Sequence, residues 1–111
     1  MTYRHVENPS EIVVIFKTHL RKGADEAEYA RTSRRMHALV ETIPGFISIK
    51  GFRSDDGEEI DIVRFANEAA LEAWRMQPEH RATQERGRQE FYDHYWVQAC
   101  RVFREYEFSL D

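Results

Sequence analysis

The stretch Ile12-Val13-Val14-Ile15-Phe16 decides the fold. It is an unbroken apolar run of mostly β-branched residues, bounded by polar residues and too short for a helix, which is typical of a β-strand. Side chains of a strand point alternately to opposite faces, so both faces of this strand are apolar. In an antiparallel sheet with helices on one face, the other face then also needs cover, and a second sheet is the simplest cover.

The residues that follow this strand predict an amphipathic helix. It begins at Ala24-Asp25, just after Gly23, and ends at Pro44-Gly45, a pair that stops helical periodicity. One face of the helix carries Tyr29, Ser33, Met36, Val40 and Ile43. Charged residues lie on its other sides, so we expect the first face to pack on the sheet.

Two further strands follow this helix. Residues 46–52 and 60–65 have strand composition, and the turn Ser54-Asp55-Asp56-Gly57 between them has residues typical of a hairpin connection. The sequence therefore predicts a β-hairpin over residues 46–65.

A second helical region comes after the hairpin. Asn67 can cap a helix over residues 68–76, and Pro78 suits the first turn of another helical piece that runs to Arg86. Gly87 marks a break near the end of this piece.

The last predicted element is a long strand over residues 95–108, which are rich in aromatic and β-branched side chains. The element order is then β-α-β-β-α-β, that of a ferredoxin-like α+β plait with an antiparallel sheet. We expect one domain over residues 1–111, in which residues 1–10 form an irregular N-terminal extension.

The length of the last strand predicts a homodimer. A strand of this length would span roughly 46 Å at about 3.3 Å per residue, whereas a compact domain of this size is about 34 Å across. The strand would therefore extend beyond its own subunit. A homodimer explains both features. The sheets of two copies would pack face to face, which covers the second apolar face of the first strand, and each last strand would extend onto the partner.

Composition excludes several classes of partner. The chain has 16 Lys and Arg residues against 20 Asp and Glu residues, a formal net charge of −4, so we expect neither nucleic acid nor an anionic membrane as a partner. The chain has no apolar run long enough to span a bilayer. A single cysteine and an N-terminus without the apolar core of a signal peptide predict a soluble cytoplasmic protein.

Three phrases carry a resemblance to a known family. They are Ile43-Pro44-Gly45-Phe46 at the helix-to-strand corner, Leu71-Glu72-Ala73-Trp74 with Pro78-Glu79-His80, and Gly87-Arg88 followed by Phe91-Tyr92 and Tyr95. In these phrases the chain resembles the antibiotic biosynthesis monooxygenase family of dimeric α/β barrels. The resemblance implies a homodimeric oxidoreductase that oxidises an electron-rich aromatic or quinol-like molecule with O2 and holds no cofactor. It also implies a ligand cavity in each subunit, with Trp74 at its wall.

Two alternatives remain beside the monooxygenase. The same dimeric barrel could bind a small metabolite without catalysis, as a sensor or stress-response protein. Haem-degrading relatives of the family carry an iron-ligating histidine ten residues after the tryptophan, but Gln84 stands at that place here. The haem alternative is therefore the weaker of the two.

His80 and Trp74 are the predicted catalytic residues. An imidazole titrates near pH 6.5 and can take a proton from a phenol at neutral pH, which makes His80 a candidate base. Trp74 could donate its indole N–H to a substrate oxygen while its ring forms an apolar wall. The structural alternatives are a solvated histidine at a helix start and a tryptophan that serves only as a core anchor.

Five other residues are candidates for substrate binding: Tyr92, His94, Tyr95, Arg64 and His19. The first three precede or open the last strand, where aromatic residues often serve as interface anchors. Arg64 and His19 lie on strands, and either would hold an anionic oxygen if it faced the helices. Otherwise Arg64 or His19 would pair with Asp61 or Glu58 at an exposed end. No metal site is expected, because His80 and His94 have no carboxylate at ligand spacing.

Overall fold

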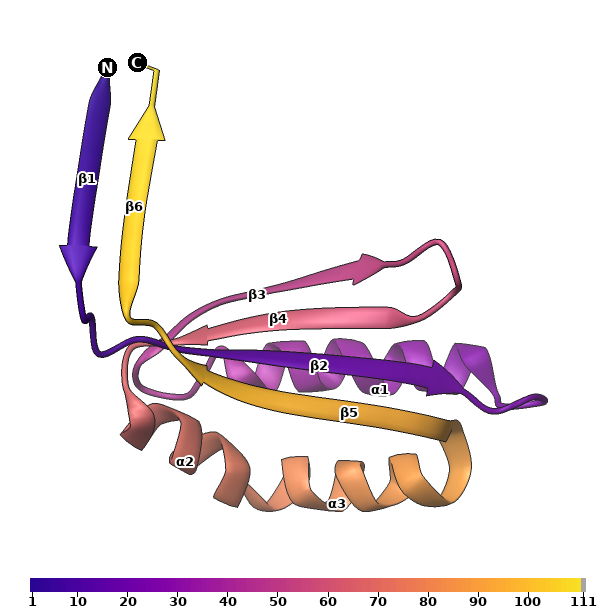
Figure 1. Ribbon diagram of the computed structural model, residues 1–111. Helices are drawn as coiled ribbons and strands as arrows, with labels where there is room; N and C mark the ends of the chain where they lie inside the picture. The colour runs from indigo at the N-terminus through magenta and orange to yellow at the C-terminus, as the bar shows by residue number, and fades with distance from the viewer. Residues whose placement is uncertain (111) are drawn as a thin grey trace.

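The computed structural model describes residues 1–110, and Figure 1 labels its main elements. In chain order these are β1 (Thr2–Glu7), β2 (Ile12–Leu20), α1 (Glu26–Val40), β3 (Phe46–Arg53), β4 (Glu59–Phe65), α2 (Glu68–Met76), α3 (Pro78–Arg86), the π-helical turn η1 (Gly87–Phe91), β5 (Tyr92–Arg101) and β6 (Arg104–Ser109). In the described part of the chain, no helix has the length and apolarity needed to cross a membrane.

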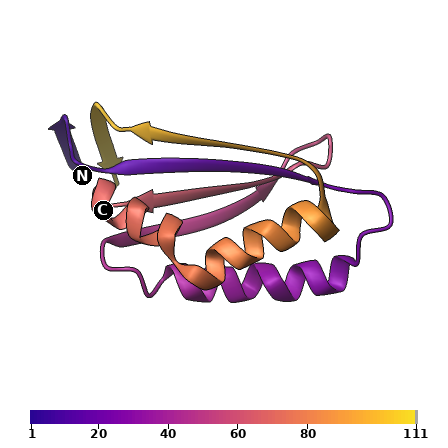
Figure 2. The same cartoon turned by 90° about the horizontal axis from the view of Figure 1, so that it is seen from below.

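The main sheet has four strands in the order β3-β4-β2-β5, and every neighbouring pair is antiparallel. The helices α1, α2 and α3 lie on one face of this sheet, as Figure 2 shows. This arrangement is the ferredoxin-like α+β plait. The predicted fold class is confirmed.

The hydrophobic core lies between the sheet and the helices. Ile12 and Val14 of β2 point to this side and pack with the fully buried Val40 of α1. Val13 and Ile15 alternate with them and point to the opposite face, which carries no helix; both are half-buried. The two-sided apolarity of β2 therefore leaves one apolar strip without a helix over it.

The corner between α1 and β3 depends on Gly45. Its φ of +92° lies in the left-handed region, and a Cβ added there would stand 2.8 Å from the Cβ of Ala70 on α2. Asn67 caps α2 as predicted, because its side-chain oxygen accepts a hydrogen bond from the backbone N–H of Ala70 at 2.9 Å. Together these features hold the start of α2 against the corner.

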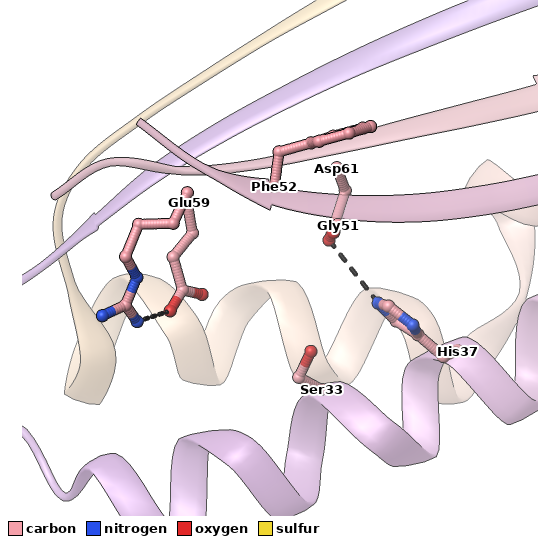
Figure 3. A pocket seen from close by; sticks show the side chains of 7 residues that line it. Ser33, His37, Gly51, Phe52, Glu59 and Asp61 are labelled. Atoms are coloured by element: carbon pink, nitrogen blue, oxygen red, sulfur yellow. Dashed lines mark hydrogen bonds and ion pairs between the residues drawn. The ribbon is translucent and has the colours of Figure 1, made fainter. Parts of the chain in front are cut away.

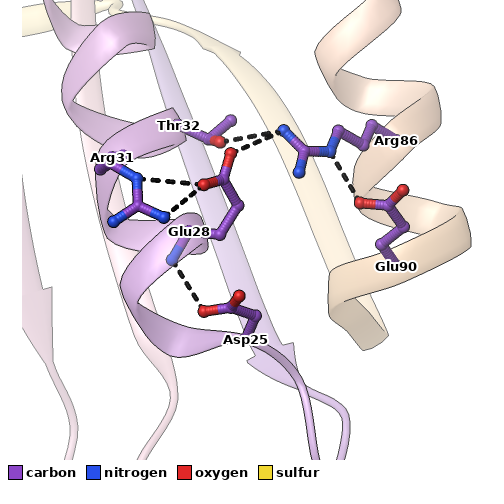
Figure 4. A network of polar contacts seen from close by, with 6 residues as sticks. All are labelled: Asp25, Glu28, Arg31, Thr32, Arg86 and Glu90. Atoms are coloured by element: carbon purple, nitrogen blue, oxygen red, sulfur yellow. Dashed lines mark hydrogen bonds and ion pairs between the residues drawn. The ribbon is translucent and has the colours of Figure 1, made fainter.

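Arg86 ties the end of α3 to the start of α1 (Figure 4). Its Nη1 donates to Glu28 of α1 at 3.1 Å and its Nε to Glu90 of η1 at 2.7 Å. The pKa of the Glu28 carboxyl is lowered, mainly by its hydrogen bond with Arg31 and also by the one with Arg86. Asp25 caps the same helix, because its side-chain oxygen accepts a hydrogen bond from the backbone N–H of Glu28. α1 is thus fixed in position over the sheet.

The prediction of an irregular extension over residues 1–10 is wrong. Thr2–Glu7 forms β1, which pairs antiparallel with β6 in a separate two-stranded ribbon. Figure 1 shows this ribbon projecting away from the main sheet. The signal was invisible locally because the pairing partner lies at the other end of the chain.

The prediction of one strand over residues 95–108 is also wrong. β5 begins earlier, at Tyr92, and the chain leaves the main sheet at Val102 and Phe103 before β6 begins. Asn8, in the segment between β1 and β2, adopts a φ of +48° and donates its backbone N–H to the carbonyl of Phe103 at 2.8 Å. Both strands of the ribbon therefore leave the main sheet at the same place.

Candidate functional site

A cavity of about 340 Å³ opens between α1 and the strands β3 and β4. Small-molecule sites have volumes of about 300–1,000 Å³. Figure 3 shows side chains of α1 facing those of β4 across the cavity, while the ring of Phe52 points away from α1. The lining residues are Ser33, His37, Gly51, Phe52, Arg53, Glu59 and Asp61. The lining side chains that face α1 from the sheet are therefore polar.

His37 and Asp61 form the centre of this cavity. Nε2 of His37 lies 3.7 Å from Oδ2 of Asp61, which is too long for a direct hydrogen bond. The same Nε2 is buried and has no hydrogen-bond partner. Burial raises the pKa of the Asp61 carboxyl, and the neighbouring His37 acts in the opposite direction. A titratable pair of this kind in a cavity is typical of sites that move protons.

The strands leave room for the Asp61 carboxylate. A Cβ added at Gly51, its neighbour on β3, would lie 3.0 Å from Oδ1 of Asp61. Arg53 and Glu59 form an ion pair at the same end of the two strands, with Nη2 of Arg53 donating to Oε1 of Glu59 at 2.6 Å. The charges of this pair compensate each other, so Asp61 keeps His37 as its own partner.

A network of hydroxyl groups lies close to Asp61 and Glu59. The hydroxyl groups of Tyr29 on α1, Thr18 on β2 and Tyr92 on β5 lie close to one another. Burial raises the pKa of both tyrosines, and the two carboxylates raise it further. The phenol groups therefore stay protonated and serve as neutral hydrogen-bond donors beside the cavity.

The predicted catalytic residues, Trp74 and His80, stack on each other away from this cavity. Their ring centroids are 3.7 Å apart with 15° between the planes. Nδ1 of His80 donates to the carbonyl oxygen of Trp74 at 2.9 Å, so the ring proton sits on Nδ1. Burial lowers the pKa of His80. Trp74 packs against the hydrophobic core, and neither residue lines the cavity.

Tyr92 and Tyr95, both predicted to bind substrate, lie on the helix side of the sheet. Tyr92 is half-buried and joins the hydroxyl network, whereas Tyr95 lies further out, with 39% of its surface exposed. The ring of Tyr95 contacts Tyr92 and Phe16, and its hydroxyl accepts from Nη1 of Arg88 at 3.1 Å. Tyr92 is thus the nearer of the two to the cavity.

The other predicted binding residues lie on the opposite face of the sheet. His19 and His94 are direct neighbours across β2 and β5, and Nδ1 of His19 lies 2.7 Å from Oδ1 of Asp93. Arg64 forms a two-pronged ion pair with Glu11, at 2.7 and 2.8 Å, rather than the expected pair with Asp61 or Glu58. The structure therefore brings none of these three to the cavity.

Sequence reasoning missed His37 and Asp61. A usable signal exists: Ser33 and His37 are four residues apart on one side of a helix, and Glu59 and Asp61 are two residues apart on one side of a strand. Polar pairs on helix-facing sides of such elements indicate a polar cavity. Within residues 1–110, no three His, Cys, Asp or Glu side chains are grouped to hold a metal ion.

Comparison with known proteins gives consistent matches. The family model described as "Antibiotic biosynthesis monooxygenase" matches residues 5–86. The uncharacterized protein YqjZ of Bacillus subtilis (strain 168) is 32% identical over 97 residues, which cover 87% of this chain and 83% of that protein.

Solved structures share the fold at lower identity. Rv0793 from Mycobacterium tuberculosis matches with a TM-score of 0.73 at 21% identity, covering 84% of this chain and 95% of that one. A mutant of SnoaB from Streptomyces nogalater, described as a cofactor-independent oxygenase, matches with a TM-score of 0.71 at 16% identity, covering 84% and 93%. The family match spans every residue that lines the cavity. The chain therefore belongs to the antibiotic biosynthesis monooxygenase family.

Proposed function

We propose that the protein is a cofactor-independent monooxygenase that oxidises a small, electron-rich hydroxylated aromatic molecule in the cavity beneath α1. The observation that carries the proposal is the His37–Asp61 pair in that cavity, in a chain of a monooxygenase family. The description of SnoaB as a cofactor-independent oxygenase supports it. Trp74 and His80 are not part of the proposed site, because neither lines the cavity.

The proposed chemistry needs an acidic substrate. Triplet oxygen reacts slowly with closed-shell molecules, but a stabilised aromatic anion can give it an electron directly. The protein then has to remove a proton, exclude water and hold the anion in place. With an anthrone-type CH2 group, one oxygen atom becomes the new carbonyl oxygen and the other leaves as water with the two hydrogens. The substrate supplies all the electrons, so no external reductant is needed.

Oxygen uptake with anthrone, whose enol tautomer carries an aromatic hydroxyl group, tests this function. We expect chelator-treated protein to consume one O2 per anthrone oxidised, and the quinone product to carry one labelled oxygen when labelled O2 is supplied. Heat-denatured protein is the control for spontaneous oxidation. Binding of anthrone without oxygen uptake would contradict the oxygenase and support the metabolite-binding alternative.

We further propose that two copies of the chain assemble through the β1–β6 ribbon. Tyr3, Tyr106 and Phe108 share one face of the ribbon and are 65%, 66% and 58% exposed. The opposite face is charged and carries the pair between Arg4 and Glu105 at 3.2 Å. A two-stranded ribbon is only marginally stable alone in water, so its aromatic face needs a partner surface. A second copy of this chain supplies that surface.

Sedimentation equilibrium at micromolar concentration tests the dimer. We expect the 13.2 kDa chain to sediment at twice its mass. Replacing Tyr106 and Phe108 together by serine should give monomers, whereas Glu107→Gln on the charged face should leave the dimer intact. A parent protein that sediments as a single chain would contradict the assembly.

A further inference from the structure

We infer that His37 is the catalytic base of this site and that Asp61 positions it. His37 accepts the proton of the substrate hydroxyl and leaves the aromatic oxyanion in the cavity. The inference builds on the proposed function, but it concerns the proton step alone, so it can be tested without oxygen.

The burial of the imidazole shows which nitrogen acts. Nε2 of His37 is shut off from solvent and faces Asp61, although the side chain as a whole is 36% exposed. The exposed part therefore belongs to the rest of the side chain, and Nδ1 is the nitrogen that a ligand can meet. A buried polar atom without a partner is rare in folded proteins and demands an explanation. A small closing movement toward Asp61 would give Nε2–H its acceptor when Nδ1 takes a proton.

The charges around His37 favour this transfer. The substrate O–H bond breaks, its electron pair stays on oxygen, and the proton forms an N–H bond at Nδ1. The resulting imidazolium lies between the new oxyanion and Asp61, whose carboxylate is 3.7 Å from Nε2. Arg53 is paired with Glu59, so it offers the oxyanion no free positive charge. The net charge of the cavity is unchanged by the transfer, which therefore needs no counterion from solvent.

The same charges predict the substrate class. The charge of Glu59 is compensated by Arg53, so it is the carboxylate of Asp61 that makes the cavity unfavourable for a ligand that arrives as a carboxylate or a phosphate. A neutral phenol enters without that repulsion and becomes charged only as His37 becomes cationic. The site thus selects neutral hydroxylated aromatics over their carboxylated analogues.

A non-oxidisable phenol tests the assignment. The probe is para-nitrophenol, whose phenol and phenolate forms absorb differently. We expect the parent protein to lower the apparent pKa of the bound probe. At a fixed pH below the pKa of the free probe, the phenolate-to-phenol ratio should then be at least tenfold higher for the bound probe than for the free probe. His37→Gln should abolish this enrichment and Asp61→Asn should reduce it. His94→Gln, which removes an exposed histidine of β5 on the sheet face opposite the cavity, is the matched control and should keep it.

A measurement on the parent protein guards against a misfolded variant. At a fixed pH, the ring 15N chemical shifts of His37 should move toward those of an imidazolium when para-nitrophenol binds, because the proton of the probe moves to the ring. Unchanged ring shifts of His37, no probe binding, or full enrichment in His37→Gln would overturn the assignment. Phenolate formation without anthrone oxidation would reject the oxygenase and keep the base. If His37→Gln still oxidises anthrone with an unchanged pH profile, His37 is not the base, whereas the oxygenase proposal stands.

Discussion

Replacing Trp74 by phenylalanine separates a core role from a substrate role for this residue. The indole packs on the hydrophobic core and stacks on His80 with 3.7 Å between ring centroids. A stacked aromatic pair contributes about 0.5–1.5 kcal/mol. The indole has three more ring atoms than a phenyl ring, and each methylene-sized group costs about 0.8 kcal/mol where it is buried. We expect Trp74→Phe to lower the free energy of unfolding by about 1–3 kcal/mol, measured by urea denaturation.

The pKa of His80 is a second readout of the same change. Burial lowers this pKa in the folded protein, and the hydrogen bond to the Trp74 carbonyl partly offsets the effect. A smaller ring at position 74 admits water to the imidazole, so the pKa of His80 should rise toward 6.5 in the variant. In the parent, folded His80 binds a proton less readily than unfolded His80, so stability falls as the pH drops below 6.5. The variant should show a smaller fall.

Activity then decides between the two roles. Because Trp74 does not line the cavity, we expect the folded variant to oxidise anthrone at the parent rate. A variant with the stability of the parent but without turnover would place the indole against the substrate. That result would refute the assignment of the cavity beneath α1 as the reaction site.

Three further changes test the fold and the cavity by urea denaturation. Gly45→Ala should cost about 1–3 kcal/mol, because φ is +92° and the new Cβ would lie 2.8 Å from that of Ala70; an unchanged midpoint would contradict the strain at this corner. Glu11→Gln should cost about 1–2 kcal/mol, because it breaks the two-pronged pair with Arg64; no loss would show that the pair is solvated. Asp61→Asn should stabilise the protein at neutral pH, because burial raises the pKa of Asp61 in the folded state. As the pH falls through this raised pKa toward 3.8, the parent should become as stable as the variant. Parallel plots of unfolding free energy against pH for the two proteins would contradict this.

Most of the main sheet could be predicted because its signals are local. The apolar run at residues 12–16, the Pro44-Gly45 stop and the turn at residues 54–57 each fix an element from neighbouring residues alone. The ends of the elements depend on residues that are distant in sequence. β2 continues to Leu20 because its polar second half pairs with β4 and β5 on both sides, which no local pattern reveals.

The β1–β6 ribbon could not be predicted because its partners are distant in sequence. Glu7 and Arg104, which pair across it at 2.9 Å, are 97 residues apart. Strand propensity is strongly context-dependent, and a short polar segment such as Thr2–Glu7 becomes a strand only when a partner edge is present. The split between β5 and β6 follows from the same pairing, because the last strand changes partners at Val102 and Phe103.

The candidate site could not be predicted from single residues, because it arises from the register of the sheet. Along the helix side of β2 and β4, cross-strand pairs change from apolar to polar. The successive pairs are Ile12 with Phe65, Val14 with Val63, Phe16 with Asp61, and Thr18 with Glu59. The apolar pairs form the core that holds the helices, while the polar end lies under the part of α1 that carries Ser33 and His37. Because one half of the interface stabilises the fold, the other half can hold a half-buried carboxylate and an unpartnered imidazole nitrogen, groups that cost stability and that we propose for the proton step.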